Sequence, residues 1–166
     1  MIIFSPNTII KAADVNANFT ESTAIASQVN PYKFSAYMGS TQSTVATTHT
    51  KLQMNTEEYD TNSNYSTSTY GYTAPVTGYY FFSVMVQLLA QAGAVFIVGF
   101  SKDGTTEFLR GQEIPNTTGN IVLSATHLIK LTAGEILYPI YYSGTASKTL
   151  NSGTVISKFS GILVSV

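Results

Sequence analysis

Residues 72–89, YTAPVTGYYFFSVMVQLL, decide the fold of this 166-residue chain. In the second half of this stretch every second residue is large and apolar, which is the period of a β-strand. Pro75 cannot donate a hydrogen bond to a sheet, so it fits the entrance of a strand. Gly78 is expected to supply a turn conformation that costs other residues free energy. The stretch therefore predicts a long strand over residues 78–90.

Both faces of this strand are apolar, whereas a strand with one wet face should alternate apolar and polar residues. One face carries Tyr80, Phe82, Val84, Val86 and Leu88, and the other carries Tyr79, Phe81, Ser83, Met85, Gln87 and Leu89. The last segment, 155–166, behaves likewise, with Phe159 and Leu163 on one face and Ile156, Ile162 and Val164 on the other. A sandwich buries only one face of each sheet, so a ligand, a lid or another subunit must cover the second face. Self-association is the commonest answer.

From about residue 32 onward the whole chain reads as β-structure, with segments rich in Val, Ile, Thr, Tyr and Phe between turn residues. Regular short strands of this kind indicate a sandwich or barrel. The polar stretch 55–68 is expected to be an exposed connection. The ten expected strands are 32–38, 43–49, 51–55, 64–73, 78–90, 93–102, 105–113, 120–131, 135–143 and 155–166.

The N-terminal zone, residues 1–30, holds the only helical pattern. Its apolar and small residues follow a heptad spacing, which predicts a short helix that is either packed on something else or part of a multi-helix stalk. We therefore divide the chain into an anchoring or stalk segment, 1–30, and a β domain, 31–166. The seam residues of the expected stalk are Val15, Phe19, Ala26 and Val29.

Composition excludes several functions. The net charge is −1 and Arg110 is the only arginine, so no basic patch is available for nucleic acid. Cysteine is absent, which excludes disulfides and thiolate metal sites. No run of about 18 apolar residues is present, so membrane insertion is not expected. The first residues lack the basic start of a signal peptide, and we expect a protein made in the cytoplasm of its host without one.

Catalytic motifs are also missing from the sequence, and we expect neither an enzyme nor a cofactor. His49 and His127 fall on separate expected strands and lack metal-ligand spacing, so His127 is expected to be an ordinary sheet histidine, or one near the symmetry axis of an assembly, and not a metal ligand. Glu107 and Arg110 are expected to form a solvated ion pair. The oxygen-rich segment Glu57-Glu58-x-Asp60 could hold calcium, but it lacks an EF-hand pattern, and we predict no metal site.

Residues 54–84 resemble the aromatic signature of the C1q-like family, F-x5-[ND]-x4-[FYWL]-x6-F-x5-G-x-Y-x-F-x-[FY]. Three positions depart from it, since Met54 and Tyr72 replace phenylalanine and Val84 replaces an aromatic residue. Later landmarks agree in order: SKDG at 101–104, LTAGE at 131–135 and FSGIL at 159–163. The matching core positions are Met54, Asp60, Tyr65, Tyr72, Gly78, Tyr80 and Phe82.

This resemblance implies a ten-stranded jelly roll of the C1q/tumour-necrosis-factor type that assembles as a tight homotrimer. It also implies that strand 78–90 and the last strand lie on the inner sheet, which would account for their second apolar faces. The signature residues are then scaffold and not an active site. The candidate trimer-interface residues are Tyr79, Phe81, Met85, Ile162 and Val164.

Residues 8–19, TIIKAADVNANF, resemble the opening segment of many structural proteins of tailed phages. In those proteins such a segment precedes a tail-fibre or other virion appendage domain. We therefore expect a trimeric virion structural protein of a bacteriophage, located on the particle surface as a tail fibre, spike knob, head fibre or capsid decoration. Residues 1–30 would contact other virion proteins.

Two other functions stay open at this stage. The head could be a host-attachment knob that binds a receptor or glycan, with tyrosines such as Tyr59, Tyr65, Tyr141 and Tyr142 as sugar platforms. It could instead be a secreted or signalling C1q-like protein of a bacterium. The residues do not tell these apart from a purely stabilising role in a particle.

Overall fold

The computed structural model describes residues 32–166 except 91, 116–117 and 145–146. Residues 32–166 form one compact unit, distinct from residues 1–31. The predicted stalk and its seam residues, Val15, Phe19, Ala26 and Val29, lie outside the described residues and stay predictions. No helix of the described part is long and apolar enough to cross a membrane.

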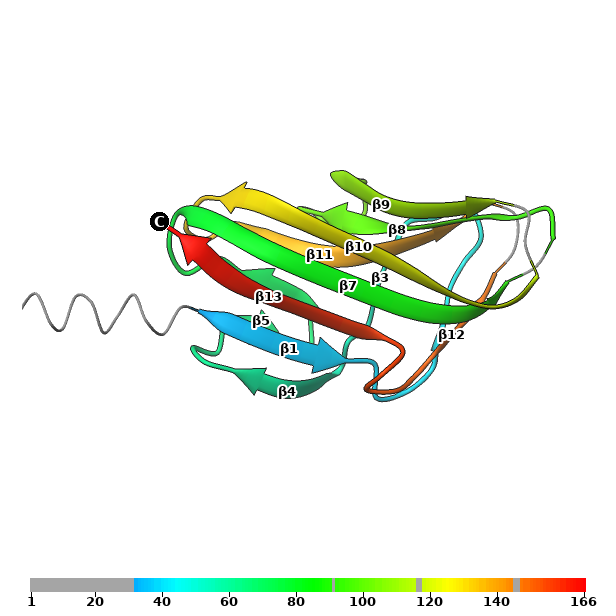
Figure 1. The fold of residues 1–166 in the computed structure, drawn as a ribbon, viewed down its shortest axis with the longest axis horizontal. Coiled ribbons are helices and arrows are strands. Elements are labelled where there is room, and N and C mark those ends of the chain that lie inside the picture. Colours follow the sequence, from blue (N-terminus) through cyan, green and yellow to red (C-terminus); the bar gives the residue numbers. More distant parts are fainter. Residues whose placement is uncertain (1–31, 91, 116–117, 145–146) are drawn as a thin grey trace, which may run out of the picture. The chain divides into compact units, whose positions relative to one another are not determined.

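Two antiparallel sheets pack face to face as an all-β jelly-roll sandwich (Figure 1). The first sheet has seven strands, with β10, β7, β13, β1 and β4 side by side in that order and β12 and β2 continuing beyond β7. Its strands are β1 (Lys33–Tyr37), β2 (Gln42–Ser43), β4 (Thr56–Asp60), β7 (Gly78–Ala90), β10 (Gly119–Leu131), β12 (Thr149–Asn151) and β13 (Lys158–Ser165).

The second sheet has six strands in the order β5-β6-β11-β8-β9, with β3 also paired to β11. These strands are β3 (Thr50–Lys51), β5 (Tyr65–Ser66), β6 (Gly71–Thr73), β8 (Val95–Ser101), β9 (Leu109–Pro115) and β11 (Ile136–Ser143).

Strand β7 organises the first sheet, because it pairs with β10 along its whole length and with β13 and β12 on its other edge. Its even-numbered side chains, from Tyr80 to Leu88, are fully buried between the sheets. The odd-numbered ones point to the opposite face, where Tyr79 and Phe81 are exposed. The two-faced pattern of the sequence thus corresponds to one core face and one open face in the single chain.

An aromatic cluster from both sheets fills the core. Phe34 of β1 stacks on Tyr65 and Tyr72 of the second sheet, with ring centroids 5.0 Å and 4.6 Å apart. Phe82 and Phe159 lie 5.9 Å apart, stacked, and complete the cluster from the first sheet. Aromatic pairs at these distances contribute about 0.5–1.5 kcal/mol beyond their area burial. The cluster joins strands far apart in sequence, and its members include three of the signature positions.

The prediction of ten strands is wrong in count, because thirteen strands lie within the described residues. The expected strand 64–73 is divided into β5 and β6 by a turn in which Tyr70 has φ +64°. The expected exposed connection 55–68 contains β4, and β12 precedes the last strand. Strand β4 was not predicted, because its sequence, TEEYD, has no alternation of apolar and polar residues. Such a polar sequence is typical of an edge strand, and β4 is paired only to β1.

Gly78 is required for a different reason than a turn conformation. Its φ is not in the left-handed region. A Cβ at this position would lie only 2.5 Å from the Ser165 carbonyl oxygen. The glycine therefore allows β7 and the end of β13 to approach each other closely, which also brings the exposed residues of the two strands together.

Two core tyrosines differ in their hydroxyl groups, which gives a matched test of the packing. Tyr65 donates a 2.8 Å hydrogen bond from Oη to the Met54 carbonyl, whereas Tyr72 Oη is buried with no partner among the described residues. We predict that Tyr65→Phe lowers the free energy of unfolding by about 1 kcal/mol, because it removes this bond. Tyr72→Phe should be neutral or stabilising by up to about 1 kcal/mol, since it removes an unpaired buried hydroxyl. Urea denaturation of both variants checks this, and equal losses would contradict it.

Candidate functional site

The open face of the first sheet is the candidate site. It is formed by the outward side chains of β7 and β13, many of which are apolar, together with those of β10, which are mostly polar. Tyr79 and Phe81 are each 44% exposed, and Leu128 of β10 is 60% exposed. Single exposed apolar side chains are ordinary on protein surfaces, but a contiguous group of them marks an interaction site.

Strand register brings these side chains into rows across the sheet. Leu128 lies opposite Phe81, and Phe81 lies opposite Ile162 of β13. Directly opposite residues of an antiparallel pair have Cβ atoms about 4.5–5.5 Å apart, so the three side chains are neighbours. In the adjoining row Tyr79 lies opposite Lys130, whose Nζ is 5.8 Å from the centroid of the tyrosine ring.

A row of hydroxyl side chains crosses the same face next to the apolar row. Ser83 of β7 lies opposite both Thr126 of β10 and Ser160 of β13, and Ser160 lies opposite Ser35 of β1. Met85 follows on the far side of this row and is half-buried. The face is therefore apolar with a polar stripe that can form hydrogen bonds with a covering surface.

A shallow, open hollow of about 200 Å³ lies on the β4 side of the apolar row. It is lined by Lys33, Phe34, Tyr59, Phe81, Ser160, Gly161 and Ile162. Tyr59 and Phe81 are exposed apolar walls of this hollow, and Lys33 adds a cation at its rim.

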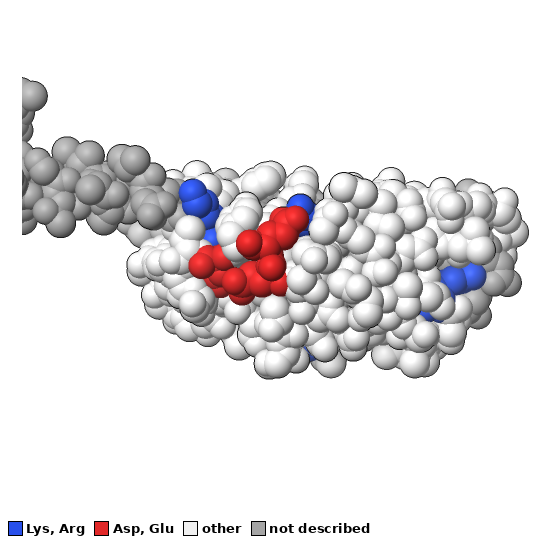
Figure 2. All heavy atoms as spheres, turned by 90° about the horizontal axis from the view of Figure 1, so that it is seen from below, with Lys and Arg blue, Asp and Glu red and all other residues white. Residues whose placement is uncertain are grey.

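The β4 edge of this sheet is acidic, and Figure 2 shows the acidic residues gathered in one patch there. Glu58 accepts hydrogen bonds from Lys158 and from the Ser35 hydroxyl, and these two interactions lower the pKa of its carboxyl group. Asp60 accepts backbone N–H bonds from Asn62 and Tyr65, so this signature residue shapes the turn before β5. Over the described ranges no group of three acidic, histidine or cysteine side chains is placed to hold a metal ion.

The five predicted interface residues, Tyr79, Phe81, Met85, Ile162 and Val164, all lie on β7 and β13 of this sheet. Ile162 and Val164 are exposed. Ile156, which the sequence placed on the same face, lies in the turn before β13 and not in the strand.

Sequence reasoning missed the contribution of β10. Its outward residues from Asn120 to Lys130 are mostly polar. The sequence therefore predicts an ordinary strand with one face in solvent. Only pairing with β7 places Leu128 beside Phe81. The two apolar residues in this outward series, Val122 and Leu128, were the available signal, and both are exposed in the single chain.

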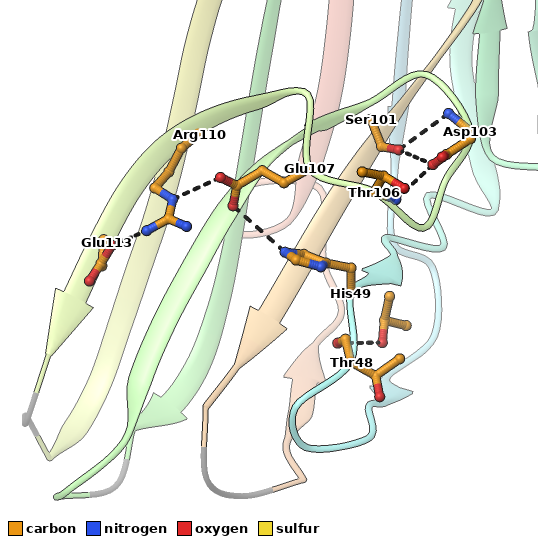
Figure 3. A network of polar contacts seen from close by, with 9 residues as sticks. Thr48, His49, Ser101, Asp103, Thr106, Glu107, Arg110 and Glu113 are labelled. Atoms are coloured by element: carbon orange, nitrogen blue, oxygen red, sulfur yellow. Dashed lines mark hydrogen bonds and ion pairs between the residues drawn. The ribbon is translucent and has the colours of Figure 1, made fainter.

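A second cluster of titratable groups forms a polar network beside the second sheet (Figure 3). Glu107 accepts a 2.9 Å hydrogen bond from Arg110 Nε, and Arg110 also bonds Glu113. His49 Nε2 is 3.6 Å from Glu107 Oε2, which is too long for a hydrogen bond. The expected Glu107–Arg110 ion pair is present, and its arginine is exposed. The network joins the connection before β3 to the connection before β9.

His127 is an ordinary sheet histidine, as expected. Its Nε2 is 3.1 Å from the Arg110 carbonyl oxygen, and its ring meets Phe100 edge-on at 5.8 Å. The proposal that tyrosines form exposed sugar platforms is wrong for two of the four, since Tyr65 and Tyr141 are buried in the core. Tyr142 packs against the His49 ring at 4.9 Å, and Tyr59 is exposed at the hollow.

A family model for the C1q domain matches residues 33–164, nearly the whole of the described unit. The chain belongs to the C1q domain family. Its signature positions are therefore family scaffold, and they fill the core as described above. No curated protein matches the chain in sequence.

Solved structures share the fold at low sequence identity. The globular domain of zebrafish complement 1qA is 18% identical, with a TM-score of 0.59 over 81% of this chain and 98% of that one. Murine APRIL is 9% identical, with a TM-score of 0.61 over 81% of this chain and 100% of that one. Eiger TNF from S. frugiperda is 11% identical, with a TM-score of 0.56 over 81% of this chain and 94% of that one. These likenesses establish a C1q/TNF-like fold.

The turn after β8 gives a pH-dependent test of the second sheet. Asp103 Oδ1 accepts hydrogen bonds from the backbone N–H groups of Thr106 and Thr105 and from the Ser101 hydroxyl, which lowers the pKa of the carboxyl group. A carboxyl group with a depressed folded-state pKa stabilises the fold above its unfolded pKa, about 3.9, and loses this effect as pH falls through the folded value.

We therefore predict that Asp103→Asn is less stable than the wild type at pH 7 and that the difference shrinks as pH falls below about 4. Urea midpoints measured at pH 7 and at pH 3 provide the test. A constant difference at both pH values would contradict the role of the carboxylate charge.

Proposed function

We propose that this protein is a trimeric structural component of a phage virion that displays its C1q-like head on the particle surface and is anchored by residues 1–30. The open apolar face on β7, β13 and β10 carries this proposal. Self-association covers such a face without needing any other molecule, since three copies can bury it around a common axis.

The composition of the face supports assembly over catalysis. It presents Tyr79, Phe81, Leu128 and Ile162 in neighbouring positions, with a row of hydroxyl groups beside them. The cores of protein interfaces are enriched in aromatic residues and depleted of charge, and this face has both properties. Membership of the C1q family favours three copies over two, because the family resemblance implies a trimer.

The virion location rests on the sequence of residues 8–19, which resembles the opening of phage structural proteins. A fibre, a spike knob, a head fibre and a capsid decoration all fit a head attached through its N-terminal segment. Electron microscopy of purified particles, with an antibody against residues 32–166, tests this location. Particles that carry no label would overturn the virion role and leave the bacterial C1q-like protein as the alternative.

A host-attachment role for the head is the second candidate. Tyr59 supports it, because this side chain is exposed beside the hollow and beside the Lys33 cation. Aromatic rings and a few polar groups are common in sugar sites, but assembly of three copies would compete for the same face. Binding of the head to host cells, lost on Tyr59→Ala, would favour this role.

The trimer makes a direct prediction for substitutions on the open face. Phe81→Asp or Ile162→Asp places a carboxylate in the centre of the proposed interface, where a desolvated and unpaired charge costs several kcal/mol. Each variant should dissociate to monomers at micromolar concentration, while Val45→Asp, at a residue 64% exposed in a connection away from the face, should stay trimeric. Light scattering coupled to gel filtration of the full chain measures the mass.

A monomeric wild-type chain would overturn the trimer outright. Circular dichroism of each variant separates dissociation from unfolding, because a dissociated head keeps the β spectrum of the wild type. Trimeric Phe81→Asp and Ile162→Asp variants would show that the copies meet through another surface.

A further inference from the structure

The turn after β8, residues 101–106, contains the pair Asp103-Gly104. It is the one place in the sequence where a glycine follows an aspartate or an asparagine. Such a pair can modify itself, because glycine has no side chain to keep its backbone nitrogen away from the preceding carboxyl group. Asp103 is exposed and Gly104 is buried, and both lie in the connection between β8 and β9 of the second sheet.

The modification is the conversion of aspartate to isoaspartate. The Gly104 backbone nitrogen attacks Cγ of Asp103, a C–N bond forms, and the carboxyl OH leaves with the proton of the nitrogen as water, which gives a succinimide ring. Water then opens the ring at either carbonyl and yields aspartate or isoaspartate. One water leaves and one enters, so no other reactant is needed. In isoaspartate the main chain runs through Cβ and Cγ and is one methylene longer.

The folded turn keeps the Asp103 carboxyl group in its unreactive form. Asp103 Oδ1 accepts a 2.7 Å hydrogen bond from the backbone N–H of Thr106 and another of 2.7 Å from that of Thr105. It also accepts a 2.8 Å hydrogen bond from the Ser101 hydroxyl (Figure 3). These bonds favour the ionised form and lower the pKa of the carboxyl group. Ring closure proceeds through the protonated carboxyl group, because an ionised carboxylate is a poor electrophile, so the hydrogen bonds slow it.

Ser101 also holds the attacking nitrogen. Its side chain is fully buried, and its Oγ accepts a 2.7 Å hydrogen bond from the Gly104 N–H while it donates to Asp103 Oδ1. Ring closure removes the proton from this nitrogen and draws the nitrogen to Cγ, so it must break the hydrogen bond between Gly104 and Ser101. One buried hydroxyl group thus contacts both reacting groups of the pair.

The backbone of the turn requires the glycine of this pair. Gly104 has φ +84°, which lies in the left-handed region that favours glycine. A Cβ at this position would also collide with Cε of Lys51, whose Nζ lies 3.7 Å from the centroid of the Tyr138 ring. The turn therefore keeps a reactive pair for structural reasons, and protection against modification must come from the hydrogen bonds around the pair.

We propose that Asp103-Gly104 is a site of isoaspartate formation that the folded turn keeps unreacted, with the Ser101 hydroxyl as the restraining group. When the turn opens, the restraints on the nitrogen and on the carboxyl group are lost together, and the pair reacts. The added methylene then moves the carboxylate away from the N–H groups of Thr105 and Thr106, so a modified chain cannot rebuild the same hydrogen bonds. This inference depends neither on the proposed virion role nor on the number of copies.

Storage of the full chain at mildly acidic pH over several weeks tests the proposal. Isoaspartate is measured after proteolysis, by chromatographic separation of the peptides that contain Asp103, whose two forms have the same mass and different retention. The wild type unfolded in guanidinium chloride should accumulate isoaspartate at this position, and the folded wild type should remain aspartate. Folded Ser101→Ala should react roughly 10-fold faster than the folded wild type, a factor that corresponds to one hydrogen bond of ordinary net strength.

Ser157→Ala is the matched control and should react like the wild type. Ser157 is equally buried, and its hydroxyl group also donates to one backbone carbonyl, of Asn151, and accepts from one backbone N–H, of Gln87, both in the first sheet. Equal rates in the folded and unfolded wild type would overturn the protection by the turn, and this comparison depends on no variant. Equal rates in the two folded serine variants would overturn the role of Ser101. A slower reaction in Ser101→Ala would also overturn it, by showing that the hydroxyl relays protons. Circular dichroism verifies that both variants are folded.

Discussion

Strand β7 is hydrogen-bonded along both edges and apolar on both faces, and the rest of the structure depends on this constraint. Its paired edges leave no room for further strands along most of its length, so its side chains can be covered only from above and below. The second sheet covers one face and forms the core. The other face keeps Tyr79 and Phe81 exposed in the single chain, and the hydrophobic effect then favours a covering partner.

The open face has a shallow hollow, exposed apolar side chains and a row of hydroxyl groups, and it carries few charged residues. Leu128, Phe81 and Ile162 supply the apolar area, and Ser83 and Ser160 supply hydrogen-bonding groups at fixed positions beside it. The charged residues of this sheet are few: Glu57, Glu58 and Asp60 on β4, Lys33 on β1, Lys158 on β13 and Lys130 on β10. Such a surface is suited to packing against another protein surface, because it offers apolar contact and hydrogen-bonding groups together.

The polar network of the second sheet has a different role. His49, Glu107, Arg110 and Glu113 connect a turn, a loop and an edge strand, and Asp103 closes the turn after β8. These contacts fasten connections to the second sheet. They stabilise the connections of the sandwich in the way that the aromatic cluster stabilises its core.

The sequence by itself determined the parts of the protein that depend on local alternation. Spacing from Met54 to Phe82 identified the family positions, and the period of two in residues 78–90 separated the core face from the open face. Strand β4, the burial of Tyr65 and Tyr141 and the neighbourhood of Leu128 and Phe81 were decided only by the tertiary structure. The physical reason is that alternation is a property of one strand, whereas pairing partners, edges and cross-strand neighbours depend on register between segments distant in sequence.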